Sequence, residues 1–136
     1  MIVVDTNIIS YMVFKTLQSD KVEALHKLDP DWEVPVLWKS EFLNVVSLYF
    51  RKNILTYQEA IQAVDFAEQL VDHHEHNVSS VMILELITQS NCSSYDCEFV
   101  ALAKNLSIKF ITYDKQTITD FPSIAFKPED YLAQIS

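Results

Sequence analysis

Short apolar runs alternate with longer amphipathic segments along this chain, and polar clusters separate them. The run at residues 2–4 is rich in β-branched side chains and precedes a polar group at residues 5–7, which predicts a buried strand that ends in a turn. The same pattern predicts further strands at about residues 33–37 and 109–113, with shorter candidates ending at Val78 and spanning residues 124–126.

The segments between these strands show helical signals. After Trp38 the apolar residues Phe42 and Tyr49 recur at helical spacing, which indicates an amphipathic helix. Thr56, with Glu59 three residues later, has the form of a capping box at the start of another helix. The predicted helices span about residues 8–14, 20–28, 38–52, 56–71, 80–88, 95–105 and 128–132.

This order of elements predicts the fold class. Strands that alternate with helices form a mainly parallel sheet with helices on both faces, which is the α/β class. A chain of 136 residues is the usual length of one globular domain, and no linker, internal repeat or low-complexity segment divides it. We therefore expect a single domain over residues 1–136, built on about four or five strands.

Composition indicates a protein that is neither exported nor embedded in a membrane. No segment reaches the roughly 18 continuous apolar residues that a membrane span needs, and Asp5 interrupts the apolar start. The two cysteines, Cys92 and Cys97, are too few for a disulfide framework, and packing is their simplest role. The sequence therefore predicts a cytoplasmic protein.

The charge balance limits how the protein can bind nucleic acid. Nineteen acidic residues outweigh nine lysines and Arg51, and the net charge of −9 opposes binding through a broad basic face. Cations would have to mediate any contact with phosphates. The chain also has no glycine, which excludes Walker loops, Rossmann fingerprints and kinase lids, because these need glycine where backbone approaches phosphate.

Four acidic residues occupy positions that this architecture would bring close together. Asp5 and Asp114 each follow an apolar strand run, and open parallel sheets bind ligands beyond the carboxyl ends of their strands. A serine pair would cap a helix whose first turn contains Asp96. Glu41 falls beside the apolar stripe of its own helix. We therefore expect all four side chains to point toward one crevice.

Converging carboxylates of this kind indicate a metal site. They repel each other, which raises their pKa values and weakens the fold unless a cation lies between them. Oxygen ligands suit Mg²⁺ or Mn²⁺, which keep several waters and share their remaining positions with substrate phosphate. Such a site can lower the pKa of a water, orient it for in-line attack and neutralise charge on phosphorus. The residues thus predict hydrolysis of a phosphodiester.

Four short motifs follow one another along the chain. They are the opening Ile2-Val3-Val4-Asp5-Thr6-Asn7, the inward-facing Glu41, the helix start Tyr95-Asp96 and the strand end Thr112-Tyr113-Asp114. Together they resemble PIN-domain nucleases, and especially the VapC toxins of toxin–antitoxin pairs. The resemblance spans almost the whole chain.

The resemblance has several implications. It implies a PIN-like three-layer α/β/α fold, a homodimer, an Mg²⁺ or Mn²⁺ cofactor and endonucleolytic cleavage of structured RNA. A toxin of this kind also implies a small antitoxin protein as its partner. The residues that match the family's metal-binding catalytic acids are Asp5, Glu41, Asp96 and Asp114, and those that match its supporting polar residues are Asn7 and Thr112.

Three of these acids also have a purely structural interpretation. Asp96 could complement its helix dipole, a role worth only about 0.3 to 1 kcal/mol, and Glu41 could be a solvated helix acid. Asp114 could cap the short segment that follows it, and Asp120 competes with it as the fourth acid. We favour Asp114 because it ends the strand.

Three other classes of protein need comparison. A haloacid-dehalogenase-type phosphatase requires a second aspartate two residues after Asp5, where this chain has Asn7. A signalling receiver domain requires neighbouring acids at the first strand end, which this chain lacks. The alternative that remains is a PIN domain that binds RNA or a partner protein without cutting, and the presence of all four acids argues against it.

The other polar and aromatic clusters are assigned no chemistry. The histidine group at residues 73–76 and the two cysteines fit no standard zinc spacing, so we interpret the histidine segment as an exposed loop. Aromatic residues such as Trp38 and Phe66 are interpreted as core or dimer contacts. Tyr49, Phe50 and the helix at residues 56–71 are candidates for a symmetric interface.

Overall fold

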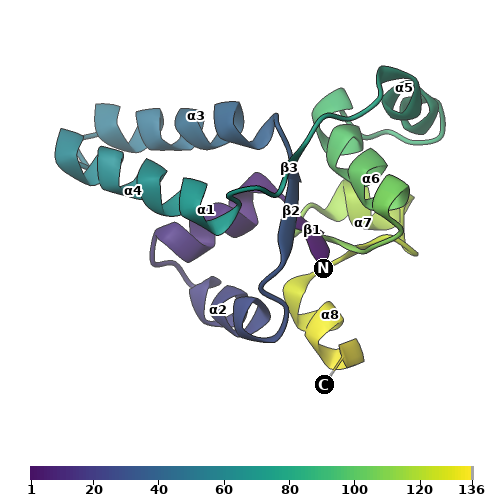
Figure 1. The fold of residues 1–136 in the computed structure, drawn as a ribbon, viewed down its shortest axis with the longest axis horizontal. Coiled ribbons are helices and arrows are strands. Elements are labelled where there is room, and N and C mark those ends of the chain that lie inside the picture. The colour runs from purple at the N-terminus through teal and green to yellow at the C-terminus, as the bar shows by residue number, and fades with distance from the viewer. Residues whose placement is uncertain (136) are drawn as a thin grey trace.

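The computed structural model describes residues 1–135, which form five short strands and eight helices (Figure 1). The strands are β1 (Ile2–Val4), β2 (Trp32–Pro35), β3 (Glu75–His76), β4 (Phe110–Ile111) and β5 (Ala125–Phe126). The helices are α1 (Thr6–Val13), α2 (Ser19–Leu28), α3 (Trp38–Arg51), α4 (Tyr57–Leu70), α5 (Ser80–Thr88), α6 (Ser94–Leu106), α7 (Lys115–Asp120) and α8 (Pro128–Ile135).

The sheet is parallel throughout, which confirms the prediction from the alternating elements. Its order is β3-β2-β1-β4-β5, so the chain builds outward from β1 on one side and then returns to build outward on the other. The reversal falls between β1 and β4, where Val4 pairs with Ile111. Asp5 and Thr112 follow these two residues, so they lie beyond the carboxyl ends of the strands, where such sheets form a crevice.

Helices cover both faces of the sheet and produce the three layers expected. Figure 1 shows α1, α3 and α4 on one side of the edge-on sheet and α5, α6 and α7 on the other. Helix α8 packs against α2. The largest fully buried side chains include Trp32, Trp38, Phe42 and Phe110, which places Trp38 in the core. No helix within residues 1–135 is long and apolar enough to cross a membrane.

Several element boundaries differ from the prediction, and two of the differences have clear causes. Helix α1 begins at Thr6 rather than at about residue 8, because the side chain of Asp5 caps it. Strand β3 lies inside the polar stretch that was expected to be a loop before Val78. It pairs with β2 alone and forms the edge of the sheet, so its polar side chains need not be buried. Apolar periodicity cannot identify a strand of this kind.

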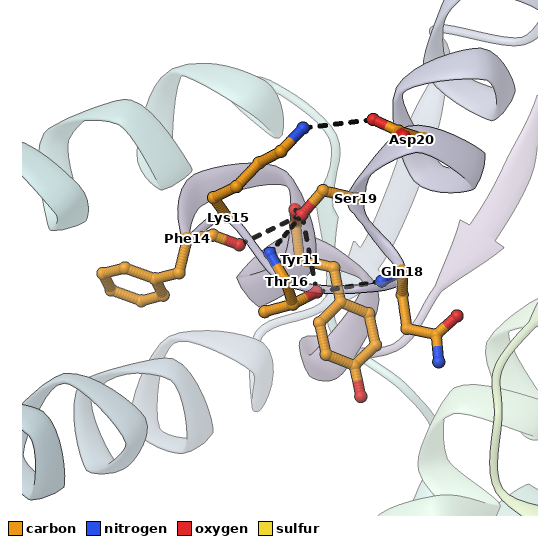
Figure 2. Close-up of polar contacts among 7 residues, drawn as sticks. All are labelled: Tyr11, Phe14, Lys15, Thr16, Gln18, Ser19 and Asp20. Atoms are coloured by element: carbon orange, nitrogen blue, oxygen red, sulfur yellow. Dashed lines mark hydrogen bonds and ion pairs between the residues drawn. The ribbon is translucent and has the colours of Figure 1, made fainter.

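The turn between α1 and α2 shows how this chain ends a helix without glycine. The buried hydroxyl of Ser19 lies 2.7 Å from the carbonyl oxygen of Tyr11 and 3.2 Å from that of Phe14 (Figure 2). It also accepts a hydrogen bond of 2.8 Å from the backbone N–H of Thr16. These contacts satisfy carbonyl groups at the end of α1, which would otherwise lack partners.

Candidate active site

Asp5 lies at the carboxyl end of β1 and is the N-cap of α1. Its Oδ1 accepts a hydrogen bond of 3.0 Å from the backbone N–H of Ile8, and its Oδ2 accepts one from the hydroxyl of Thr112. Burial disfavours the charged form and raises the pKa of Asp5 to about 6, although the hydrogen bonds from Thr112 and Ile8 oppose the rise. The negative charge of Asp96 adds to it. The carboxyl group is therefore both firmly positioned and costly to ionise.

Glu41 lies in the first turn of α3 and reaches the β1–α1 junction. Its Oε1 accepts a hydrogen bond of 2.8 Å from the hydroxyl of Thr6. Burial raises the pKa of Glu41, the bond from Thr6 lowers it, and the negative charges of Asp96 and Glu98 raise it further. The interpretation of Glu41 as a solvated helix acid is therefore wrong.

Asp96 lies in the first turn of α6, three residues after its N-cap Ser93. The hydroxyl of Ser93 accepts a hydrogen bond from the backbone N–H of Asp96 and donates one to its Oδ2, both at 3.1 Å. Burial raises the pKa of Asp96, as does the negative charge of Asp114, while the bond from Ser93 lowers it. An acid that only complemented a helix dipole would have a lowered pKa. Asp96 therefore belongs to a group of mutually repelling acids.

Asp114 has the capping role that the sequence left open for it. It is the N-cap of α7, where its Oδ2 accepts hydrogen bonds from the backbone N–H of Thr117 at 2.9 Å and from its hydroxyl at 2.7 Å. Its own backbone N–H donates to the hydroxyl oxygen of Thr112 at 3.0 Å. Thr112 thus contacts both Asp5 and Asp114 and fixes the distance between the two strand ends.

Asp120 has a different environment. Its Oδ2 accepts a hydrogen bond of 2.8 Å from the backbone N–H of Asn91 and lies 3.5 Å from the thiol of Cys92. The hydrogen bond from Asn91 is the main cause of its lowered pKa. These contacts connect the end of α7 to the loop before α6. Asp120 therefore has a structural role, which favours Asp114 as the fourth acid.

Three of the four predicted acids line one cavity of about 250 Å³. They are Asp5, Glu41 and Asp96, and the residues that complete the lining are Thr6, Asn7, Asn44, Val45 and Phe99. The lining does not include Asp114, which acts on the cavity through its charge on Asp96. Of the two predicted supporting residues, Asn7 lines the cavity, and Thr112 holds Asp5 without lining it.

Sequence reasoning missed Thr6 and Asn44. Asn44 follows Glu41 by three residues on α3, so helical spacing places both side chains on one face and could have identified it. No comparable signal existed for Thr6, because its hydrogen bond to Glu41 connects residues 35 positions apart.

The interpretation of the histidine segment as an exposed loop holds for His73, whose side chain is 90% exposed, but is wrong for residues 75 and 76, which form β3. The imidazoles of His74 and His76 lie 2.5 Å and 2.8 Å from the carboxylate of the buried Glu33. The cysteines take no part in this cluster. Cys92 and Cys97 are free and buried, in agreement with a packing role.

The cavity acids lack positive partners. Among the ion pairs within residues 1–135, none involves Asp5, Glu41, Asp96 or Asp114. The ionisable groups of the lining are all carboxylates. A set of partly buried oxygen donors without a basic neighbour fits a hard divalent cation, which would offset their mutual repulsion.

Fold and cavity together define an α/β domain with an acidic, oxygen-rich site at the reversal point of a parallel sheet. The sequence profile of the PIN domain matches residues 2–127, so the chain belongs to the PIN-domain family. PIN domains are generally nucleases. The family predicted from the four motifs is confirmed.

Solved structures share this fold. FitAcB from Neisseria gonorrhoeae is 18% identical, with a TM-score of 0.75 over 95% of this chain and 99% of that one. A toxin-antitoxin complex from Klebsiella pneumoniae is 16% identical, with a TM-score of 0.67 over 94% and 98%. VapBC-1 from nontypeable Haemophilus influenzae is 17% identical, with a TM-score of 0.63 over 95% and 99%. A search of curated proteins finds no match. At these identities the likeness establishes the fold.

Proposed function

We propose that this protein is a metal-dependent endoribonuclease that hydrolyses RNA phosphodiesters, and that it is the toxin of a toxin–antitoxin pair. The cavity that Asp5, Glu41 and Asp96 share is the observation that supports this most. Burial raises the pKa of each of these carboxyl groups. Burying carboxylates close together costs folding free energy, and groups with pKa values shifted in this way cluster at functional sites.

The donor set fits Mg²⁺ or Mn²⁺. The residues that would hold the ion are Asp5, Glu41, Asp96 and Asp114. When bound, the ion would lower the pKa of a water and offset negative charge on the phosphate.

The side chains around the acids would position the carboxylates and the substrate. The hydroxyls of Thr112 and Thr6 donate to Asp5 and Glu41 and hold one oxygen of each carboxylate in place. The amides of Asn7 and Asn44 line the same cavity and would donate hydrogen bonds to phosphate or ribose oxygens. Because the net charge is −9, RNA would be recognised through its shape and its 2′-hydroxyls rather than through a basic face.

A cleavage assay with a metal titration tests the proposal. The purified protein is incubated with a structured RNA in EDTA, and then with millimolar Mg²⁺ or Mn²⁺. Cleavage that appears only with metal supports the nuclease. Binding of RNA without cleavage at any metal concentration would support the alternative, a non-catalytic PIN domain that acts as a binding module.

The toxin assignment predicts a protein partner. Its support is the similarity of fold to the toxin-antitoxin complex from Klebsiella pneumoniae. Co-expression with the product of the neighbouring reading frame is expected to yield a stable complex in which RNA cleavage is suppressed. If neither neighbouring product binds or inhibits the protein, the nuclease proposal stands and the toxin assignment fails.

Asp114 and Asp120 are expected to differ in their effect on cleavage. Asp114→Asn should reduce the rate by about 10²-fold, because it removes one of the four carboxylates proposed to hold the ion, whereas asparagine still caps α7. Asp120→Asn should change the rate by less than about threefold, an effect below 1 kcal/mol. Single-turnover cleavage by both variants measures the difference. The reverse order of effects would identify Asp120 as the fourth acid.

We also propose a homodimer that forms through α3 and α4. Apolar side chains that are 44% to 65% exposed extend over these helices, among them Leu43, Phe50, Tyr57, Ile61 and Phe66. Three of these five residues, Leu43, Tyr57 and Ile61, line a groove of about 400 Å³ on α3 and α4. Light scattering at micromolar concentration is expected to give the mass of a dimer.

A charge placed in this groove tests where the dimer forms. Ile61→Asp should produce a monomer, because a carboxylate buried in an apolar interface is strongly unfavourable. Val81→Asp is the matched control, since Val81 is 66% exposed on α5. A monomeric wild type contradicts the dimer. A dimer that survives the first change and is lost with the second would place the interface on α5.

A further inference from the structure

A second group of metal-binding side chains lies on the β2–β3 edge of the sheet. Side chains alternate between the two faces of a strand, so Asp31 and Glu33 share one face of β2 and its approach, and His74 and His76 share one face of β3. Val34 pairs with Glu75 in the parallel register, so the two pairs lie side by side on the same face of the sheet. Cys92 and Cys97 are not part of this group.

Glu33 is the centre of the cluster. Its side chain is only 5% exposed, whereas those of His74 and His76 are 39% and 32% exposed. Its Oε2 lies 2.5 Å from Nδ1 of His74, and its Oε1 lies 2.8 Å from Nε2 of His76. The carboxylate is thus held at both oxygens, while the histidines leave a path to solvent.

Asp31 has an oxygen that these contacts do not satisfy. Its Oδ1 is shielded from solvent and has no hydrogen-bond partner, although it lies 3.1 Å from Nδ1 of His74. A ring nitrogen has one proton to donate, and the shorter contact of that nitrogen is with Glu33. A buried oxygen without a partner is costly, and a cation between Asp31, Glu33 and His74 would satisfy it.

The two carboxylates also conflict electrostatically. The contact with Glu33 raises the pKa of Asp31, and burial adds to the rise. Burial opposes ionisation of Glu33, but its polar contacts with Asp31, His76 and His74 hold its pKa below the usual range. The carboxylates of Asp31 and Glu33 therefore compete for the one proton on Nδ1 of His74.

We propose that Asp31, Glu33 and His74 bind a divalent transition-metal ion of the Zn²⁺ class, at a site separate from the acidic cavity. One donor atom from each of the three residues lies within 4.8 Å of the other two. His76 is a positioning residue that holds the second oxygen of Glu33.

The donors select the class of ion. Imidazole suits Zn²⁺ and similar transition metals, whereas Mg²⁺ prefers oxygen ligands alone. Nδ1 of His74 must lose its proton to bind, so binding releases a proton to solution. The ion would connect the edge strand β3 to β2, and solvent could reach its remaining position past the half-exposed Asp31 and His74.

This site does not depend on the proposed nuclease function. None of its three ligands lines the cavity of Asp5. Glu33 pairs with Val3 in the middle of β1, and Asp31 lies further toward the amino end of the strands. The acidic cavity lies at the carboxyl end. A metal titration can therefore separate the two sites by variants.

Zinc binding by the full-length chain tests the proposal. Asp5→Asn and Asp96→Asn are combined to silence the acidic cavity, the protein is stripped with EDTA, and ZnCl₂ is titrated by calorimetry. One equivalent is expected to bind. His74→Gln in the same background should weaken that binding by about 100-fold or more, since loss of a supporting group alone costs about 10 to 100-fold.

His73→Asn is the matched control, because His73 is the neighbouring histidine and its side chain is 90% exposed. Asparagine also tolerates the left-handed backbone that this position adopts, with φ of 66°. This variant should bind Zn²⁺ as the background does. Equal binding by His74→Gln would mean that the ion is bound elsewhere, and it would overturn the proposal.

A measurement on the unaltered chain covers the case in which His74→Gln does not fold. The imidazole nitrogens of ¹⁵N-labelled wild type are followed by NMR during addition of ZnCl₂. The Nδ1 resonance of His74 is expected to shift on binding, while those of His73 and His26 stay in place. A His74 resonance that does not move at saturating Zn²⁺ would also overturn the proposal.

Discussion

Asparagine in place of Asp5 or Asp96 is expected to reduce metal-dependent RNA cleavage by at least about 10³-fold. A metal ion that stabilises developing charge is worth several kcal/mol, and each 1.36 kcal/mol corresponds to about tenfold in rate. Both acids line the cavity, so the loss of either charge should remove that stabilisation. Asparagine is close in shape and is an equally good N-cap, so the β1–α1 junction should keep its structure.

The measurement is single-turnover cleavage of a structured RNA in Mn²⁺, with circular dichroism to confirm that each variant folds. Asp72→Asn is the matched control, because Asp72 is 71% exposed and lies outside the cavity. It should cleave at the wild-type rate. Wild-type cleavage by Asp5→Asn and Asp96→Asn would show that the cavity acids do not catalyse the reaction.

The second large effect concerns stability without metal. Asp5→Asn is expected to stabilise the metal-free protein at pH 7 by about 2 to 3 kcal/mol, because one pKa unit corresponds to about 1.36 kcal/mol. Burial raises the pKa of Asp5 from 3.8 to about 6, with the bonds from Thr112 and Ile8 opposing it. At pH 7 the carboxyl group is charged in both states, and only the folded state bears the cost of burying that charge. Asparagine removes this cost.

The pH dependence has a definite sign. Since the pKa is higher in the folded state, the folded protein binds the proton more tightly than the unfolded chain. Wild type in EDTA should therefore become less stable as the pH rises from about 4 to about 6, and the penalty should be complete above about pH 6. The stability advantage of Asp5→Asn over wild type should shrink toward zero as the pH falls through this range.

Urea unfolding in EDTA at pH 7 and pH 4.5 measures this difference, with Asp72→Asn again as the control. Metal should offset most of this difference at pH 7. At a Mn²⁺ concentration of about 100 times Kd, wild type should gain about 2.7 kcal/mol, and Asp5→Asn should gain far less. Identical unfolding of wild type in EDTA and in Mn²⁺ would contradict a metal site at these acids.

The amino-acid sequence by itself was sufficient to predict the order of elements, the parallel sheet and the position of two strand-end residues. These features depend on local signals, because β-branched runs form strands and apolar residues at helical spacing form helices. Asp5 and Asp114 were placed at one edge for the same reason, since each follows an apolar run. The short edge strand β3 lacked such a signal, and the short strand expected to end at Val78 ends at His76.

Only the tertiary structure decided which side chains meet. Thr6 contacts Glu41 across 35 residues, and His74 contacts Glu33 across 41. Contacts of this kind depend on the register of strands and the packing of helices, which a pattern along one chain does not encode. Burial likewise decides the charge state of the acids, because desolvation depends on what covers a carboxylate and not on its neighbours in sequence. The local pattern therefore determined the scaffold, and packing determined the chemistry at its edges.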